Sequence, residues 1–370
     1  MSMNYKSENS YNIARNGFSM RRFSIIQIII ILCVAIGHIS TMPLGPGNPE
    51  IAQHFGYDPS WFGMNVLFML SGYMALRSLA RHGSVTTLLK SRFAGIFPML
   101  TTYTALIIFV IYPLFGQAAQ SFSQLAAQMS LYAIDVISCI NPGRPLKGLL
   151  DEAHYSCIIQ GATWTFRWGA IAFMGLGAAH VLKLLGHKTA IFAMAVISLS
   201  SYVLAQVIVV NFGISVPEIL FAPLRLGAMF TIGMATYAYR DQIKCSYAIA
   251  AILLALAIVH HVVMPWSPLI EIIASLFWGY CALIGLAESA AAPQKAVTRR
   301  GFAAALFIFH WPIAQLLLVA LPEITSIGLI LITLPVTIVF STLINRAYLY
   351  CASIVKKAIA ERKNPEVITP

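Results

Sequence analysis

The sequence predicts an all-α, polytopic integral membrane protein with about ten transmembrane helices and both termini in the cytoplasm. Three observations predict this fold: the composition, a series of long apolar runs, and the distribution of Lys and Arg between them. Of the 370 residues, 59% are hydrophobic and only 10% are charged, and the mean hydropathy is +0.78. A soluble domain is about half apolar and about a quarter charged. The lipid bilayer is therefore expected to be part of the solvent, and a large domain outside the membrane is excluded.

The apolar runs are each bounded by charge, proline or glycine, and each approaches the roughly 20 residues that a spanning helix needs. The first run, for example, follows Arg21 and Arg22 and ends before Pro43. The ten expected helices cover residues 24–42, 61–80, 97–115, 162–182, 189–210, 217–239, 246–264, 268–286, 301–321 and 326–348.

The basic residues fall almost entirely on one side of this path. With the N-terminus inside, 20 of the 24 Lys and Arg lie on inner segments, and only Arg144 and Lys147 lie in outer loops. The remaining two, Arg167 and Arg225, fall within spans. Basic residues collect on the cytoplasmic side of membrane proteins. The net charge of +11, which in a soluble chain would suggest a nucleic-acid partner, is therefore explained by topology, and no nucleic-acid partner is expected.

The expected organisation is a cytoplasmic segment (1–23), a ten-helix membrane domain (24–348) and a basic cytoplasmic tail (349–370). The first apolar run is too long for a cleaved signal peptide and no small-residue cleavage site follows it, so it is kept as a span.

One long outer segment, 116–161, contains a weakly apolar stretch at 125–140. We expect this stretch to form a helix on the outer face, because counting it as a span would invert every later loop and remove the charge bias. Cys139 and Cys157 both lie in this segment. In an oxidising compartment they would form a disulfide or remain as two free thiols, and the sequence leaves both open.

Polar side chains share one stripe of the first span. Gln27 and His38 are eleven residues apart, which brings them back to within about 20° of one helix face with a rise of about 16 Å. Such a stripe is expected to face protein or water. The alternative role of these residues is helix packing through hydrogen bonds to a neighbouring helix.

Three further stretches carry unusual residues. The second span contains Ser71 and Gly72, which permit close helix approach, and Pro98 stands at the expected start of the third. The ninth contains His310 followed by Pro312. A kink with satisfied polar groups, and so a structural role for His310, is the first expectation there, with direct catalysis as the alternative.

Together these stretches resemble acyltransferase family 3, the ten-span membrane acyltransferases that include bacterial O-acetyltransferases of surface polysaccharides. The positions that match its motifs, in chain order, are His38, Phe68, Leu70, Ser71, Gly72, Tyr73, Arg92, Pro98, Trp164, His310, Trp311 and Pro312. The chain departs from the pattern at Gln27, where a basic residue is typical, at Gly95, which is often Arg, and at Gly169, where an acidic residue is typical.

The resemblance implies a protein of the bacterial cytoplasmic membrane with no permanently bound cofactor or metal. Its donor would be cytoplasmic acyl-CoA, usually acetyl-CoA, and its acceptor a hydroxyl of an extracytoplasmic polysaccharide or lipid-linked sugar. The CoA phosphates need cations, which Arg77, Lys90 and Arg92 would offer at the inner ends of the second and third spans. Gln27 lies near the same surface. The alternative is that these cations only mark the cytoplasmic side.

His38 is the candidate base, because a neutral imidazole can accept the proton of an attacking sugar hydroxyl. Covalent transfer through an acyl-His38 is the alternative. With the acidic position occupied by Gly169, either Glu218 or Glu271 is expected to orient the His38 ring. Arg167 is expected either to stabilise a developing oxyanion or to pair with one of these glutamates.

Two other functions fit the same residues. One is a multi-span transporter or flippase for a glycan intermediate, which would also use a polar path but would not bind acyl-CoA. The other is a non-catalytic family member in polysaccharide assembly, which the residues at Gln27 and Gly169 would suit.

Overall fold

The computed structural model describes residues 20–46, 59–117, 121–151, 153–214, 216–243, 246–263, 268–287 and 298–363. Within these ranges every regular element is a helix, which confirms the all-α prediction. The longer helices are α2 (Met20–Thr41), α4 (Pro59–His82), α5 (Val85–Leu106), α7 (Phe122–Ile137), α8 (Thr165–Val181), α9 (Lys188–Phe212), α10 (Glu218–Ala238), α11 (Tyr247–Val263), α12 (Pro268–Ala287), α13 (Thr298–Ala320) and α14 (Ser326–Lys363). The short ones are η1 (Met42–Leu44), the π-helical η2 (Ile107–Ile111), α6 (Tyr112–Phe115) and η3 (Leu184–Gly186).

The membrane character of the chain is visible in these helices. Each of the ten apolar runs coincides with a helix. Among the described residues, six helices are long and apolar enough to cross a membrane: Phe23–Leu44, Val85–Phe115, Lys188–Phe212, Ile219–Ala238, Gly301–Ala320 and Ser326–Val355. The chain is thus a multi-pass membrane protein by length and composition of its helices, and the total of ten crossings and the sides of the termini stay predictions.

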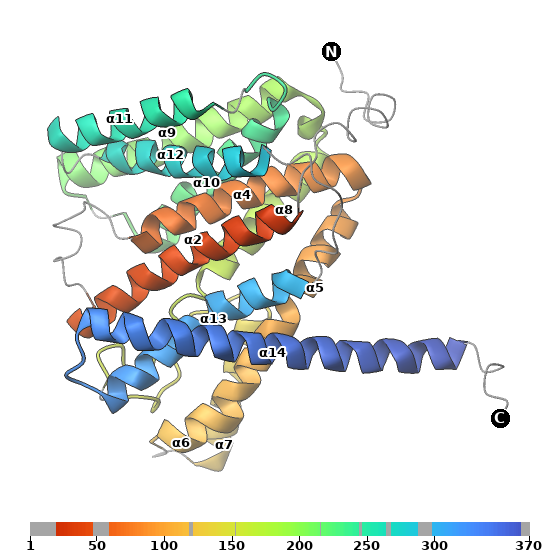
Figure 1. Ribbon diagram of the computed structural model, residues 1–370, viewed down its shortest axis with the longest axis vertical. Coiled ribbons are helices and arrows are strands. Elements are labelled where there is room, and N and C mark those ends of the chain that lie inside the picture. Colours follow the sequence, from red (N-terminus) through yellow and green to blue (C-terminus); the bar gives the residue numbers. More distant parts are fainter. Residues whose placement is uncertain are drawn as a thin grey trace.

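Helix α4 lies at the centre of the bundle (Figure 1) and packs against α2, α5, α10 and α12. This position explains why it is less apolar than the other spans: its polar side chains, such as the fully buried Asn65, face protein. Large apolar side chains instead lie exposed on the outer helices, among them Phe212 on α9 and Val262 on α11. Exposed apolar surface on this scale is typical of contact with lipid.

Glycines set the crossing of α4 and α10. A Cβ built on Gly72 would overlap the backbone carbonyl of Phe230, and one built on Gly233 would overlap that of Met69. The two backbones are therefore in direct contact, as the small residues at Ser71 and Gly72 predict for this span.

The third predicted span begins too late. The structure starts α5 at Val85, where Ser84 caps the helix by accepting a hydrogen bond from the Thr87 N–H, and places Pro98 inside the helix. The residues before Pro98 are amphipathic rather than apolar, so hydropathy alone misses them.

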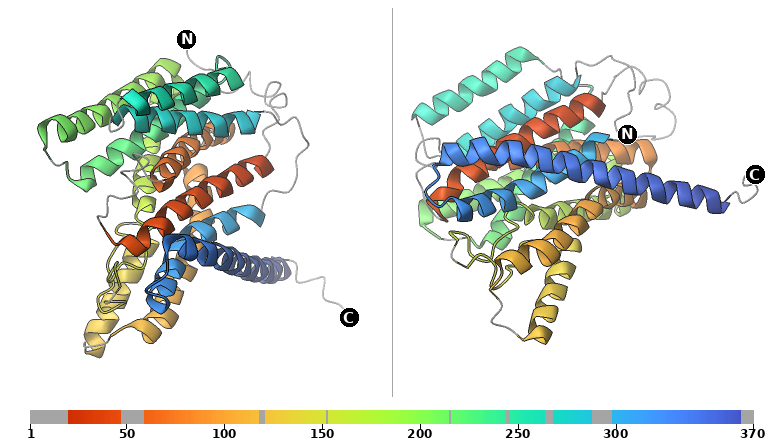
Figure 2. Two further views of the ribbon diagram at one scale, coloured as in Figure 1. Left: turned by 60° about the vertical axis from the view of Figure 1, so that its left-hand side comes forward. Right: turned by 60° about the horizontal axis from the view of Figure 1, so that its bottom comes forward.

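The last predicted span continues as helix α14 to Lys363, through the predicted end of the membrane domain at 348. Its C-terminal part extends beyond the other helices (Figures 1 and 2). Buried polar residues every fourth position, Thr333, Thr337 and Ser341, mark the face of the helix that is turned inward, and α14 packs against α13 and α2.

Helix α7 occupies the stretch that is predicted to form an outer-face helix. It starts with a capping box between Ser121 and Gln124 and packs along α5 (Figure 1). Cys139 and Cys157, in the irregular segment after it, are both free thiols. Burial raises the pKa of the Cys139 thiol, whereas the Cys157 thiol donates to a carboxylate oxygen of Asp151 at 3.2 Å.

Candidate functional site

A cavity of about 340 Å³ lies between α2, α4, α5, α8, α10 and α13. On α4 its lining runs from Met64 to His82, a distance of about 27 Å along the helix axis. Its lining divides into a basic, polar part and an apolar part. The polar part consists of Gln27, Ser71, Arg77, Ser78, Arg81, His82, Ser91, Arg92 and Thr165.

The basic part of the cavity is formed by the C-terminal end of α4 and the first half of α5, which a turn at Gly83 and Ser84 brings together. Arg77 and Arg81 are one helical turn apart on α4, and Arg92 joins them from α5. The Arg92 guanidinium lies 5.5 Å from the centre of the Phe173 ring on α8, a cation–π contact that holds it against the wall. The structure therefore brings two of the three predicted cations, Arg77 and Arg92, to one cavity.

Of the two other positions predicted for donor binding, Gln27 and Lys90, only Gln27 lines the cavity. Gln27 lines the same cavity from α2. Lys90 is exposed and is not part of the lining. Lys90 lies on a different face of α5 from Arg92, because residues two positions apart on a helix do not share a face.

Apolar side chains form the rest of the lining, including Ile31, Phe68, Phe166, Phe230 and Phe307. Gly95 and Gly169 also line the cavity, and a Cβ on either would meet no atom within 4 Å. At both positions the structure therefore has room for a Cβ atom.

The histidine pair lies beside Phe307, one of these apolar lining residues. The Nδ1 atom of His38 is 3.0 Å from the Nε2 atom of His310, 272 residues away in the chain. His310 is fully buried, and its ring centre is 6.1 Å from that of the cavity-lining Phe307. The Trp311 ring meets His38 edge-on at 5.3 Å. His310, expected mainly as a structural residue near a kink, is thus the direct partner of the candidate base.

An irregular segment after α7 packs on α13 beside the histidines. Trp311 Nε1 donates to the Ile158 carbonyl at 3.2 Å, and Gln315 Nε2 donates to the Tyr155 carbonyl at 3.0 Å. The Trp311 ring leaves no room for a Cβ at Gly161. The segment 155–161 is therefore fixed against the same helix that carries His310. Trp164, also singled out by the motif pattern, occupies the N-cap position of α8 just after this segment, without a capping hydrogen bond from its side chain.

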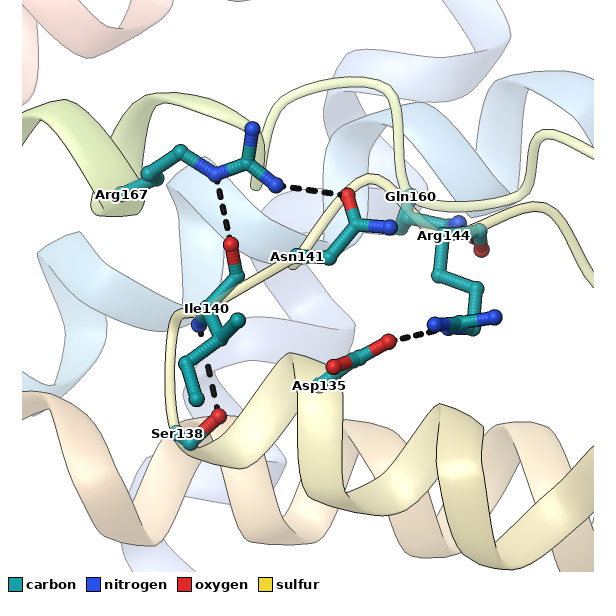
Figure 3. A network of polar contacts seen from close by, with 7 residues as sticks. All are labelled: Asp135, Ser138, Ile140, Asn141, Arg144, Gln160 and Arg167. Carbon is teal, nitrogen blue, oxygen red and sulfur yellow. Dashed lines mark hydrogen bonds and ion pairs between the residues drawn. The ribbon is translucent and has the colours of Figure 1, made fainter.

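Arg167 belongs to a different network, drawn in Figure 3. Its Nε atom donates to the Ile140 carbonyl at 2.6 Å, and its Nη2 atom to the Asn141 side chain at 2.9 Å. Asp135 and Arg144 form an ion pair in the same network. Arg167 thus holds the segment after α7 onto the start of α8, and it is not part of the cavity lining.

Glu271 is fully buried within a separate polar cluster. Its carboxylate accepts hydrogen bonds from Asn65 at 2.8 Å and from Tyr202 and Gln206, which stand one turn apart on α9. Asn65 also donates to Ser275 at 2.8 Å. The carboxylate is engaged by α4 and α9 and contacts neither His38 nor Arg167, so the prediction that it orients the base is not supported.

The remaining predicted acid, Glu218, is the first residue of α10, and its side chain lies outside what the structure describes. Beside the Glu271 cluster, the buried Arg225 guanidinium stands over the Trp61 ring at 3.3 Å. The sequence signals that indicate this cluster are polar residues spaced by four, at Tyr202 and Gln206 and at Glu271 and Ser275.

Comparison of the chain with protein-family models, with curated proteins and with solved structures finds no match. The candidate site therefore has to be interpreted from its own geometry and chemistry.

Proposed function

We propose that this chain is a membrane O-acyltransferase, which moves an acyl group, foremost acetyl, from cytoplasmic acyl-CoA to a hydroxyl of an extracytoplasmic polysaccharide or lipid-linked sugar. One observation carries the proposal. Phe307 lines the arginine-containing cavity, and its ring centre lies 6.1 Å from that of His310, the hydrogen-bonding partner of His38. This supports the proposal, because a cavity with cations suited to a phosphorylated donor would then lie beside the candidate base.

The basic part of the cavity suits the nucleotide portion of CoA. Arg77, Arg81 and Arg92 line it together, and guanidinium groups bind phosphate oxygens through two parallel hydrogen bonds. The apolar lining beyond them suits the thin pantetheine chain. A volume of about 340 Å³ is within the usual range for small-molecule sites.

The His38 imidazole suits the chemistry of acyl transfer to an alcohol. Its ring nitrogen takes the proton from the sugar hydroxyl while the hydroxyl oxygen attacks the thioester carbonyl carbon. A C–O bond forms, the C–S bond breaks, and the CoA sulfur leaves with the proton that His38 returns. The glycan gains the acyl group, and free CoA is released.

Donor binding and transfer are tested separately on the full chain in lipid nanodiscs. We expect radiolabelled acetyl-CoA to bind the wild type. Arg92→Ala should weaken binding about 10-fold or more, as expected for loss of a hydrogen bond to a charged group. Lys90→Ala is the matched control, because Lys90 is exposed and does not line the cavity, although it stands two residues from Arg92 on the same helix.

Transfer is measured from the same donor to polysaccharide and lipid-linked sugars extracted from the producing cells. We expect His38→Ala to abolish transfer and to leave acetyl-CoA binding within about two-fold. Binding without transfer in the wild type would indicate a non-catalytic member of such a system. Absence of binding would overturn the proposal and favour the transporter, for which lipid-linked glycan flux across vesicles is then measured.

A further inference from the structure

We infer that His310 is a positioning residue that fixes the His38 ring in one tautomer, with the lone pair of Nε2 available as the base. This inference rests on the proposed function for its catalytic consequence, but the proton arrangement itself follows from the geometry of the two rings.

The two imidazoles lie end to end. Their ring centres are 5.2 Å apart and their planes differ by 13°, while the facing nitrogens are 3.0 Å apart. The difference of about 2.2 Å between these two distances equals two ring radii. The line from one ring centre to the other therefore passes close to both nitrogens. Since the lone pair of an imidazole nitrogen lies in the ring plane, this is the alignment of a direct N–H to N hydrogen bond.

The direction of that bond is set from the far side of His310. Its Nδ1 atom lies 3.3 Å from the backbone carbonyl of Leu306, and a carbonyl oxygen only accepts. Nδ1 therefore carries the hydrogen. In a fully buried position the neutral ring is favoured over an unpaired cation, which leaves Nε2 of His310 as an acceptor. His38 must then donate from its own Nδ1, and its Nε2 atom is left without a hydrogen.

In this arrangement His310 has the role of the carboxylate in a Ser-His-Asp triad, which holds the base in the correct tautomer. When His38 takes a proton at Nε2, its bond from Nδ1 to His310 becomes charge-assisted and strengthens. The hydrogen bond that His310 Nδ1 donates to the Leu306 carbonyl makes Nε2 of His310 a stronger acceptor, which further strengthens the bond from His38. In the resting state no charge is held at this depth, in contrast to a carboxylate partner.

Two substitutions separate positioning from packing. His310→Gln places an amide oxygen near the former Nε2 atom, where it accepts from His38, whereas His310→Leu removes the acceptor. In the transfer assay we expect His310→Leu to lower kcat about 100-fold, within the range for general-base catalysis, with KM for acetyl-CoA changed less than two-fold. His310→Gln should retain kcat to within about 10-fold. Equal loss in both variants, or no loss in either, would overturn the inference.

A second readout does not depend on activity. In protein labelled with nitrogen-15 at histidine, the His38 signals are those that disappear in His38→Ala. We expect the Nδ1–H tautomer of His38 in the wild type and in His310→Gln, and a mixture of tautomers in His310→Leu. Gln315→Leu, which removes another buried polar side chain from α13, should leave the tautomer unchanged.

A wild-type His38 protonated at Nε2 would refute the proposed order of hydrogen bonds even if transfer is observed. If the wild type transfers no acyl group but shows the Nδ1–H tautomer, the proposed function fails and the positioning by His310 stands.

Discussion

Replacing Gly233 with Ala should separate α4 from α10 and destabilise the whole bundle. A Cβ at this position would lie 2.8 Å from the carbonyl carbon of Met69 and 3.0 Å from the backbone nitrogen of Tyr73. Both atoms belong to the backbone of α4, so neither can swing aside as a side chain would. The reciprocal contact, Gly72 against the backbone of Phe230, prevents relief by a small rotation of either helix.

The size of the effect follows from these distances. Carbon atoms in contact are about 3.5 Å apart at their closest, so the Met69 carbonyl carbon alone requires the helices to move apart by about 0.7 Å, and the Met69 carbonyl oxygen, which lies closer still, requires more. A gap of that size forfeits roughly a quarter to a half of the dispersion energy of each contact along the crossing. Overpacking of this kind lowers the free energy of unfolding by about 1–3 kcal/mol.

Gly227 on the same helix provides the matched control, because a Cβ there meets nothing within 4 Å. In Gly227→Ala the only expected effect is the higher helix propensity of alanine, which should raise the free energy of unfolding by up to about 1 kcal/mol. Unfolding in mixed micelles, followed by circular dichroism, gives both values. Equal changes in the free energy of unfolding of Gly233→Ala and Gly227→Ala would refute the backbone contact at Gly233. Acetyl-CoA binding should also weaken in Gly233→Ala alone, since Phe230 forms part of the cavity wall.

Three other outcomes follow from the structure. Glu271→Leu should lower the free energy of unfolding by about 1–3 kcal/mol for each buried donor left unsatisfied, and Glu271→Gln by less, in the same assay. The double variant Gln27→Arg with Gly169→Glu should be more stable than the sum of its single variants predicts, by about 0.5–3 kcal/mol; strict additivity would show that the two positions do not interact. In two variants that each keep one cysteine, a membrane-impermeant maleimide should label Cys157 in intact cells and should label Cys351 only after permeabilisation. The reverse pattern would overturn the predicted outer side of Cys157 and the predicted cytoplasmic side of Cys351.

The helical fold follows from the sequence because the bilayer dictates both the length and the apolar character of each run. The same rule explains the misplaced start of α5. Its first half is partly exposed and carries Lys90 and Arg92, so it does not read as apolar. The signals that fix its true start are the positive φ of Gly83 and the Ser84 cap.

The cavity was partly predictable, and the histidine pair was not. Arg77 near the end of α4 and Arg92 in the first half of α5 belong to consecutive helices joined by a short turn, so the sequence already places them close together. His38 and His310 belong to spans that are distant in the chain, and no spacing rule relates them. Arg167 differs again, because its partners Ile140 and Asn141 lie in an irregular segment whose path depends on tertiary contacts.

Of the three departures from the acyltransferase pattern, all of which line the cavity, those at Gln27 and Gly169 amount to one change under the proposed function. A basic residue at 27 and an acidic residue at 169 would add charges of opposite sign, so replacing both by neutral residues leaves the net charge of the lining unaltered. The positive charge that attracts phosphate remains with Arg77, Arg81 and Arg92. Loss of only one of the pair would have left a charge in the cavity wall without its counterpart, which is costly away from water. Under the proposed function, the joint replacement is therefore expected to keep donor binding intact, and with His310 orienting His38 the proposed base would not need a carboxylate at position 169.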